Sequence, residues 1–176
     1  MLKNTKQLKS IRIRVDADKG FYKRQGITKY EAEYLLRKGY KQIKRKSCFS
    51  NTKKIYLLKP RANEGINHFF LIMDIYNYLK NKDVNVKLFQ TLKPDVTFEI
   101  LNNKIAVEVE TGKVLKNNKK NLIEKVENLN RNYDFWFFVL TNRNLAKKYK
   151  KYGIVADKRY LKNYFEKLFF KFVDVY

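Results

Sequence analysis

Residues 93–113 read K-P-D-V-T-F-E-I-L-N-N-K-I-A-V-E-V-E-T-G-K, and this stretch decides the fold. Two runs in which apolar and polar residues alternate, 96–100 and 105–109, flank a pair of asparagines, Asn102 and Asn103. Alternation on both sides of a two-residue turn signal predicts a tight β-hairpin. One face of that hairpin is then wholly apolar.

The other face of the predicted hairpin gathers carboxylates. With the turn at Asn102 and Asn103, Asp95 lies opposite Glu110, and Glu108 lies beside them, with opposed Cβ atoms about 5 Å apart and diagonal ones about 7 Å. Like charges at this spacing destabilise a sheet unless something positive sits between them. Three carboxylates suit a hard divalent cation such as Mg²⁺ or Mn²⁺, so we predict a metal site here. The alternative is a half-exposed hairpin whose charges lie in water.

The charge of the whole chain indicates its partner. Its 176 residues carry a net charge of +23, with a pI near 10.0, and a surface this basic favours a polyanion, so we expect DNA. An anionic membrane would satisfy the same field, but no apolar run reaches the roughly 18 residues of a spanning helix and the start lacks a signal peptide, so we expect no membrane and a cytoplasmic location. One cysteine and one histidine exclude an internal disulfide and a structural zinc site. The sequence leaves open whether the chain forms a homodimer.

This charge is unevenly distributed. Residues 1–63 hold 19 Lys and Arg against 4 Asp and Glu, whereas residues 94–110 hold four acids and one base. An acidic pocket within a basic protein is what a metal-dependent nuclease needs, because the bases hold phosphates and the acids hold the ion.

The order of these motifs resembles a known superfamily. Pro94-Asp95, a strand, a turn, a strand and then Glu108-x-Glu110 is similar to the core motif of the PD-(D/E)xK nucleases, in which a metal site cuts phosphodiester bonds. Within that superfamily the chain is more similar to the replication-relaxation proteins of plasmids and mobile elements. That similarity covers about residues 64–141, and its features are a helix with His68 and Asp74, Pro94-Asp95, the run Glu108-Val109-Glu110-Thr111-Gly112, and a helix with Lys125 ending near Tyr133.

The resemblance implies a fold, an activity and a set of residues. It implies an α/β domain over 61–176, a mixed sheet flanked by helices with a restriction-endonuclease-like core, which acts as a Mg²⁺- or Mn²⁺-dependent DNA endonuclease in the replication or mobilisation of a plasmid, virus or mobile element. Asp95, Glu108 and Glu110 would be the metal ligands and catalytic carboxylates, with the Val109 carbonyl assisting. The helix before the hairpin would add Glu64. The chain departs from the family at 110, where lysine is usual, so Lys113 or Lys125 would supply the missing cation.

Residues 1–60 are predicted to be a basic DNA-binding region. Residues 10–15 alternate apolar with basic and predict a strand, residues 20–26 a loop bracketed by glycines, and Thr28 to Glu31 match a capping box that starts a helix with Ala32, Leu35 and Leu36 inward. A basic hairpin follows over 42–58, so this region resembles part of a winged helix; a solvated hairpin packed on the main sheet is the alternative. The basic side chains expected to contact DNA are Arg12, Arg14, Lys44, Arg45, Lys46, Lys53 and Lys54.

Hydrophobic periodicity supplies the rest of the chain. It predicts a largely buried helix over 64–80, a strand over 84–88, a helix over 118–132, a buried central strand over 135–140, a basic helix over 142–152, an edge strand at 154–155 and a last helix from 157.

Other interpretations remain open. His68 shares a helical face with Glu64, and it is either a hydrogen-bonded core residue or part of the site. The whole protein could instead be a DNA-binding protein with an inactive nuclease-like site, or an RNA-binding factor whose many Tyr and Phe stack on bases.

Overall fold

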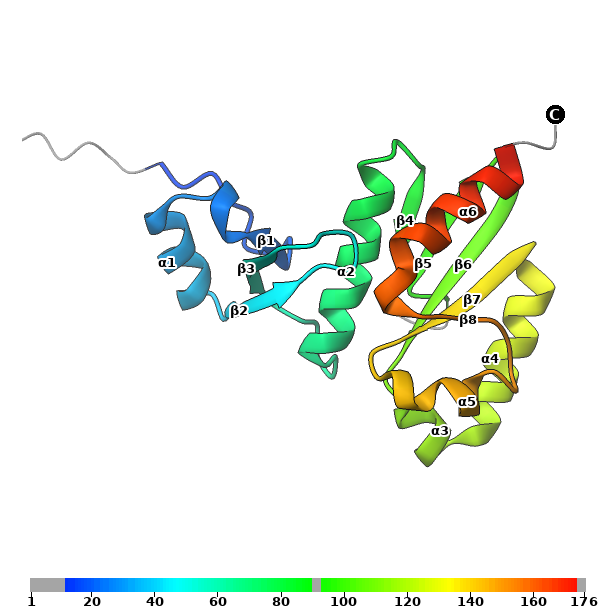
Figure 1. Ribbon diagram of the computed structural model, residues 1–176. Helices are drawn as coiled ribbons and strands as arrows, with labels where there is room; N and C mark the ends of the chain where they lie inside the picture. Colours follow the sequence, from blue (N-terminus) through cyan, green and yellow to red (C-terminus); the bar gives the residue numbers. More distant parts are fainter. Residues whose placement is uncertain (1–11, 90–92, 174–176) are drawn as a thin grey trace, which may run out of the picture. The chain divides into compact units, whose positions relative to one another are not determined.

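The computed structural model describes residues 12–89 and 93–173, and the chain divides into two compact units. Unit 1 holds the residues up to Arg45 together with Lys54–Lys59, and unit 2 holds Lys46–Lys53 and the chain from Pro60 onward. Both units combine helices with a sheet, so the predicted α/β class is confirmed (Figure 1). Among the described helices, none is long and apolar enough to cross a membrane.

Unit 1 is a three-stranded sheet with one α-helix in its described part. Its elements are β1 (Phe21–Lys23), α1 (Lys29–Arg37), β2 (Lys41–Lys46) and β3 (Lys53–Leu58), and β3 is the middle strand. α1 begins with the predicted capping box, in which Thr28 Oγ1 accepts from the Glu31 N–H and Glu31 Oε2 accepts from the Thr28 N–H. Ala32 and Leu35 are buried as predicted, against Tyr40 and Leu57. The resemblance of this unit to a winged helix stays a prediction.

Three predictions for unit 1 were wrong. Residues 12–15 form no strand, because the Arg14 N–H binds Glu31 Oε1 rather than a neighbouring strand; residues 10 and 11 lie outside the described part. The predicted loop over 20–26 contains β1 and a 3₁₀ turn, Arg24–Gly26. Leu36, expected to face inward, is 43% exposed.

Unit 2 is built on one mixed sheet in the order β4-β5-β6-β7-β8. Its strands are β4 (Val86–Leu88), β5 (Val96–Ile100), β6 (Asn103–Glu110), β7 (Phe135–Leu140) and β8 (Val155–Ala156), and its α-helices are α2 (Ile66–Lys80), α3 (Lys113–Asn117), α4 (Lys119–Asn132), α5 (Ala146–Tyr149) and α6 (Leu161–Val173). β5 pairs antiparallel with both β4 and β6, whereas β7 pairs parallel with both β6 and β8. The crossover from β6 to β7 therefore passes through α3 and α4.

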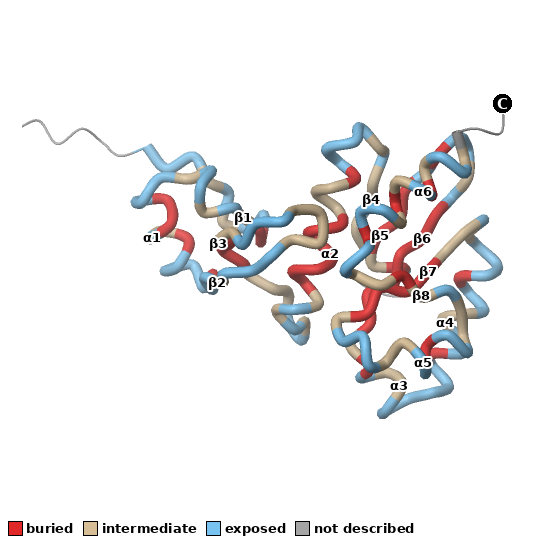
Figure 2. The backbone as a smooth tube through the Cα atoms, viewed as in Figure 1, coloured by how far each residue is buried: buried red, intermediate tan, exposed pale blue. Residues whose placement is uncertain are grey.

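Helices cover both faces of this sheet, as predicted, and the two faces differ in chemistry. One face buries Ile105, Val107 and Val109 of β6 with α2 and α6. On the opposite face Phe138 and Leu140 of β7 pack against α4 and α5. Figure 2 shows the buried backbone concentrated in β6, β7 and α2, with exposed residues on the outer helices. Each such apolar side chain contributes about 1.5–3 kcal/mol when it is fully buried. Because the first face buries more of them than the opposite face, it supplies most of the core.

The hairpin at the centre of the sheet forms with a register different from the predicted one. Ile100 pairs with Asn103 and Val96 pairs with Val107, so the turn residues are Leu101 and Asn102. Both have positive φ, 44° and 67°, as a two-residue type I′ turn requires. The register moves by two residues, which keeps every side chain on its predicted face but places Asp95 beside Glu108 instead of Glu110.

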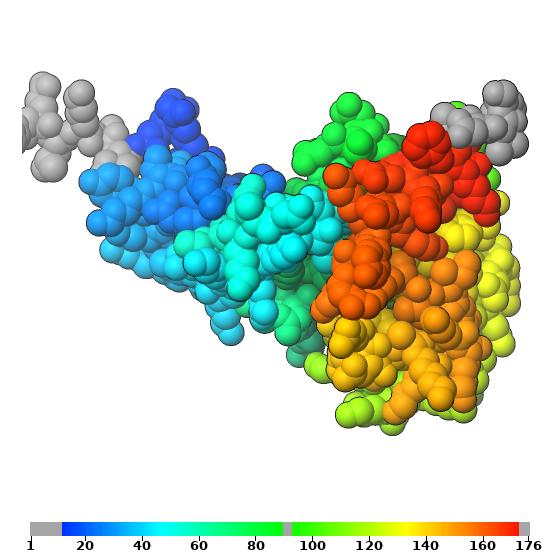
Figure 3. Space-filling view, in the orientation of Figure 1, coloured from blue at the N-terminus to red at the C-terminus, as the bar shows by residue number. Residues whose placement is uncertain are grey.

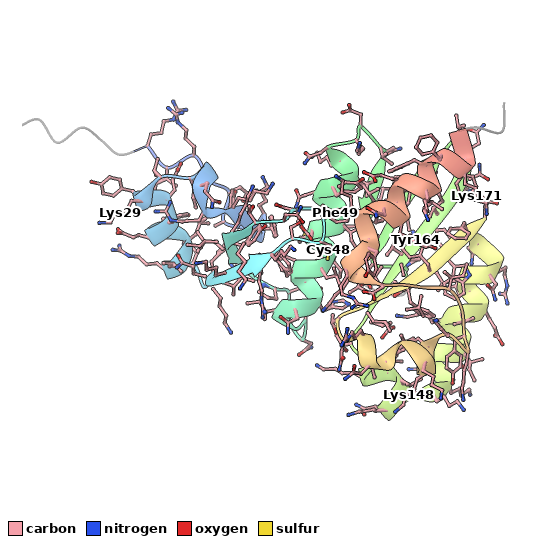
Figure 4. The ribbon with its side chains drawn as sticks, in the orientation of Figure 1. Lys29, Cys48, Phe49, Lys148, Tyr164 and Lys171 are labelled. Carbon is pink, nitrogen blue, oxygen red and sulfur yellow. The ribbon has the colours of Figure 1, made fainter. Side chains whose placement is uncertain are left out.

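The tip between β2 and β3 packs within unit 2. Phe49 stacks on Tyr78 of α2, with ring centroids 3.9 Å apart, and contacts Phe165 of α6. Asp74 Oδ2 accepts a hydrogen bond of 2.7 Å from the Cys48 N–H, so this carboxylate anchors the tip. Figure 4 labels Cys48 and Phe49 beside α2, with Tyr164 on α6 nearby.

Among the remaining predicted elements of unit 2, the strand predicted over 135–140 has those bounds, the edge strand predicted at 154–155 lies one residue later, and the others are shorter than predicted. The basic helix predicted over 142–152 is a 3₁₀ turn, Arg143–Leu145, followed by the single turn of α5. The last helix begins with another 3₁₀ turn, Lys158–Tyr160, which Asp157 caps. α3 was not predicted, since Gly112 and Asn118 bound a segment too short to show periodicity.

We predict that Leu101→Asn stabilises the protein. Leucine at positive φ costs about 1–2 kcal/mol, and asparagine tolerates that conformation, so the gain should approach 1 kcal/mol and raise the Tm by about 2–4 °C in thermal melts. The side chain is 50% exposed, so little packing is lost. A lower Tm would contradict this turn, because the register with Asn102 and Asn103 at the turn places Leu101 in the strand.

Candidate active site

The candidate site is centred on two buried carboxylates at the end of β6. Glu108 and Glu110 are 2% and 6% exposed and stand two residues apart on one strand, on the face that α4 covers. Neighbouring carboxylates in a poorly solvated place repel each other and cannot both remain ionised without a compensating cation.

Lys125 of α4 supplies that cation. Its Nζ lies 2.9 Å from Glu108 Oε2 and 3.1 Å from Glu110 Oε1. Burial by itself would lower the pKa of Lys125, but Glu108 and Glu110 raise it above its ordinary value, so the side chain is an ammonium ion. Its side chain is 37% exposed, so solvent reaches the cluster past Lys125.

Tyr149 of α5 provides the second hydrogen-bond donor to Glu110. Its hydroxyl donates a hydrogen bond of 3.0 Å to Glu110 Oε2, and burial followed by the charge of Glu110 raises the pKa of this phenol. Both oxygens of Glu110 are therefore engaged, one by Lys125 and one by Tyr149. Tyr149 was not among the predicted site residues, because an aromatic residue in a Lys-rich stretch carries no distinguishing signal.

Gly112 allows α5 to approach this strand end. Its φ of +88° is unfavourable for other residues, and an added Cβ would lie 2.6 Å from Leu145 Cδ1. Leu145 directly precedes α5, so the glycine at this position lets the chain turn out of β6 while α5 stays close enough for Tyr149 to reach Glu110.

Asp95 lies beside Glu108 at the start of β5. Val96 pairs with Val107, so continuing the antiparallel register by one residue brings Asp95 opposite Glu108. Asp95 Oδ2 accepts a hydrogen bond of 2.8 Å from the Val109 N–H. The Val109 carbonyl, predicted to assist a metal, instead accepts a hydrogen bond of 2.8 Å from His68 Nε2.

His68 and Glu64 join the cluster from the start of α2. His68 Nδ1 lies 2.9 Å from Glu64 Oε1, and Nε2 lies 3.5 Å from Asp95 Oδ2. Burial opposes protonation, but hydrogen bonds to Asp95 and Glu64 outweigh it and raise the pKa of His68 to about 10. A protonated ring donates through both nitrogens, so His68 links Glu64 to Asp95 and to β6.

The charge balance of the cluster raises the pKa of Glu108. Burial is the main cause and raises it to about 8; Lys125 opposes that rise, and the charges of Asp95 and Glu110 add to it. Tyr133, at the end of α4, also has a raised pKa, through burial and then the charge of Glu108. Glu108 is therefore the carboxylate that an additional cation would stabilise most.

A pocket of about 310 Å³ opens beside Asp95 and His68. Arg61 and Lys113 bring positive charge to its wall, and Arg61 Nη1 donates to the Phe89 carbonyl at 3.2 Å. The other lining residues are Ala62, Asn63, Glu64, Gly65, Phe89 and Thr111. A pocket lined by both carboxylates and cations suits a phosphate group that approaches a metal ion.

If a divalent ion binds here, two carboxylates rather than three remain to hold it. Among the described residues, no group of three or more His, Cys, Asp and Glu side chains is arranged to hold a metal ion. Glu110 is occupied by Lys125 and Tyr149, whereas Asp95 and Glu108 each have one carboxylate oxygen for which the described residues provide no hydrogen bond. Mg²⁺ is commonly bound by one or two carboxylates and keeps several waters, so Asp95 and Glu108 could hold it.

The basic residues predicted to contact DNA are mostly exposed. Arg12 and Arg14 line a broad hollow of about 900 Å³ in unit 1, together with Lys19 and Tyr22. Along the hairpin, Lys44, Arg45, Lys46 and Lys53 are exposed and Lys54 is half-buried. Of the predicted catalytic residues, Lys113 lies at the pocket wall and Lys125 lies in the carboxylate cluster.

Comparison with known proteins adds no relative. No family model, no curated protein and no solved structure matches the chain.

We predict that Lys125→Met destabilises the protein by roughly 2 kcal/mol, less than the ~3–5 of a fully buried pair because the side chain is partly exposed. Lys125→Met should cost less stability in a protein that already carries Glu108→Gln, since that substitution removes one of the carboxylates that would be left unpaired. Chemical denaturation of both single variants and the double variant measures this coupling.

Lys120→Met on the same helix is the control. Lys120 has a side chain that is 86% exposed and lies 3.9 Å from Glu124, so its substitution should change stability by less than about 0.5 kcal/mol. Additive effects of Lys125→Met and Glu108→Gln would contradict the described ion pair.

Proposed function

We propose that this protein is a metal-dependent nuclease that hydrolyses phosphodiester bonds in DNA, in the replication or mobilisation of a plasmid, virus or mobile element. The observation that carries the proposal is the convergence of ionisable side chains from four segments at one strand end. Glu64 and His68, Asp95, the Glu108–Glu110 pair and Lys125 meet there, in a protein with a net charge of +23.

The order of the elements also supports the proposal. A helix with His68 precedes Pro94-Asp95, a hairpin leads to Glu108 and Glu110, and the next helix carries Lys125. This is the order on which the resemblance to PD-(D/E)xK nucleases rests. In this chain the tertiary contacts bring those separated motifs within hydrogen-bonding distance of one another.

Each residue has a role that follows from its contacts. Asp95 and Glu108 would hold the metal, which when bound lowers the pKa of a coordinated water and neutralises charge on the phosphate. Lys125 is the cation next to these carboxylates, and through its exposed part it would stabilise negative charge on the phosphate. Glu110 keeps Lys125 in place, and Lys113 and Arg61 would bind phosphates at the pocket wall.

Positioning of Asp95 depends on its two partners. The Val109 N–H holds Oδ2 from the strand, and the protonated His68 ring lies on the other side. We therefore assign His68 and Glu64 to orienting Asp95 rather than to binding the metal. A carboxylate whose direction is set before the substrate arrives needs no reorganisation at the reaction.

A DNA-binding protein without cleavage is the second candidate. The observation that favours it is Lys125 itself, because its ammonium already neutralises Glu108 and Glu110 and reduces their attraction for a metal ion. In that case the basic surface would act alone. Titration of Mn²⁺ into the purified protein separates the two functions, since only the nuclease needs the ion.

We predict that Asp95→Asn lowers plasmid nicking by at least about a hundredfold. The substitution removes charge from a metal ligand and keeps an oxygen that can accept from the Val109 N–H. Nicking of supercoiled plasmid is measured with Mg²⁺ or Mn²⁺, and EDTA should abolish it.

Glu99→Gln on the same strand is the matched control. Glu99 is exposed and pairs with Lys104 near the turn, so the variant should nick at the wild-type rate. Equal nicking by wild type and Asp95→Asn would exclude Asp95 from catalysis, and no nicking by the wild type under any divalent ion would favour the second candidate.

DNA binding itself should depend steeply on salt. Lys44 and Lys46 are exposed and stand two residues apart on β2, so they share one side of the strand. We predict that Lys44→Gln/Lys46→Gln reduces the slope of log K against log salt by about two, the number of phosphate contacts removed. Lys119→Gln/Lys120→Gln on α4 is the control, and an equal change in both would show that β2 makes no particular contact.

A further inference from the structure

A second pocket lies at the carboxyl ends of β7 and β8, in unit 2. Its volume is about 350 Å³, close to that of the candidate active-site pocket, and it shares no lining residue with it. Its walls are Leu140, Arg143, Asn144, Ala146, Lys150, Val155, Ala156, Asp157, Lys158 and Arg159. In open α/β sheets, ligands bind at the carboxyl ends of parallel strands, so the place is suited to a ligand.

The wall of this pocket is strongly cationic. Arg143, Lys150, Lys158 and Arg159 line it, with Asp157 as the only acid among the lining residues. The charge of the surroundings has the same sign, because residues 142–173 contain ten Lys and Arg against two acids. The positive charges of a pocket with this excess of cations repel one another, so the pocket attracts an anion.

Contacts already present orient two of these cations. Asp157 Oδ1 accepts from the Arg159 N–H and Nε–H at 3.0 and 3.1 Å, and hydrogen bonding to Arg159 is the main reason why the pKa of Asp157 is lowered. Lys158 Nζ donates to the Thr141 carbonyl at 2.6 Å, which holds its ammonium over the end of β7. The single acid is thus paired with Arg159, and Arg143 and Lys150 are exposed without a carboxylate of their own among the described hydrogen bonds.

The pocket stands next to the candidate active site on the same edge of the sheet. Leu140, in its wall, pairs with Glu110 in the register of β6 and β7, and the Thr141 N–H donates to the Glu110 carbonyl. Neighbouring strands are about 4.8 Å apart, so the ends of β7 and β8 lie roughly 5–10 Å from the end of β6. A nucleic-acid strand crossing this edge would present successive phosphates to both places.

We infer that the pocket at the ends of β7 and β8 is a phosphate-binding site that holds the DNA backbone beside the cleavage site through Arg143, Lys150 and Lys158. The inference rests on the proposed function only for the choice of DNA as the source of the phosphate. Figure 3 shows α5 and the segment that leads into α6 side by side on the surface of unit 2. A free phosphate or a mononucleotide is the other source of the same chemistry.

The test compares two double variants of the full chain that remove equal charge. Arg143→Gln/Lys150→Gln changes the pocket, and Lys147→Gln/Lys148→Gln changes two exposed lysines of α5 outside the lining; Lys148 is labelled in Figure 4. Binding of a fluorescently labelled DNA duplex is measured over a salt series in EDTA, so cleavage plays no part. The pocket variant should reduce the slope of log K against log salt by about two, and the control by clearly less.

Asp157→Asn provides a test with the opposite sign. It removes the one acid of the pocket and keeps an oxygen for the Arg159 N–H, so DNA should bind more tightly than to wild type at the same salt. Thermal melts of all variants verify that they remain folded, so that a change in affinity does not come from unfolding.

Calorimetry with inorganic phosphate and with a mononucleotide distinguishes the two sources. If only the pocket variant changes the slope of log K against log salt for DNA, the result supports the DNA backbone as the ligand. If that slope is unchanged, and wild type binds the small ligands while the pocket variant does not, the DNA assignment is overturned and the pocket remains a phosphate site. Equal slopes for both double variants without small-ligand binding overturn the inference. These binding measurements do not depend on nicking. If the wild-type protein does not nick DNA, the proposed function fails but the test of the phosphate site is unaffected.

Discussion

The ion pair between Lys125 and the two carboxylates at the end of β6 is the interaction on which the candidate site depends. Glu108 and Glu110 are almost fully buried, and two carboxylates in that position are stable only beside a cation. Lys125 reaches them because the crossover between the parallel strands β6 and β7 lays α4 over that face of the sheet. The same helix buries Leu122 and Leu129, so apolar packing positions the charge. Fold and site therefore share one element.

β6 separates two environments by the alternation of its side chains. Val107 and Val109 enter the apolar core with α2 and α6, whereas Glu108 and Glu110 face α4 and α5. The two environments meet at the strand end, where the backbone of Val109 donates to Asp95 and accepts from His68. The backbone of Val109 therefore links His68, at the start of α2, to Asp95 of the hairpin through two hydrogen bonds. This explains how residues far apart in the chain form one polar cluster.

Most elements of unit 2 could be predicted from periodicity, and the errors have physical causes. The buried run of β7 and the amphipathic pattern of α4 are strong signals because each extends over a whole element. The turn of the hairpin was placed one residue too late, since Asn102-Asn103 is a better turn signal than Leu101-Asn102, yet β-pairing selected the latter. Because the resulting register shift is two residues, the predicted faces survived while the partner of Asp95 changed. The strand predicted over 10–15 is absent from its described part, because Ile13 and Val15 alternate with arginines but have no neighbouring strand with which to pair.

The sequence by itself determined the mixed α/β class, the apolar face of the hairpin, the basic character of the chain and the presence of Asp95, Glu108 and Glu110 on one polar face. These follow from composition and from a period of two, which are local properties. Only the tertiary structure decided that Lys125 neutralises the carboxylates, that Tyr149 completes Glu110 and that His68 reaches Asp95. These contacts join residues 15 to 39 positions apart, and their distance depends on how helices pack on the sheet rather than on any local pattern. The resemblance narrowed the 40 Lys and Arg of the chain to Lys113 or Lys125, and only the packing of α4 on the sheet decided that Lys125 lies between the two buried carboxylates.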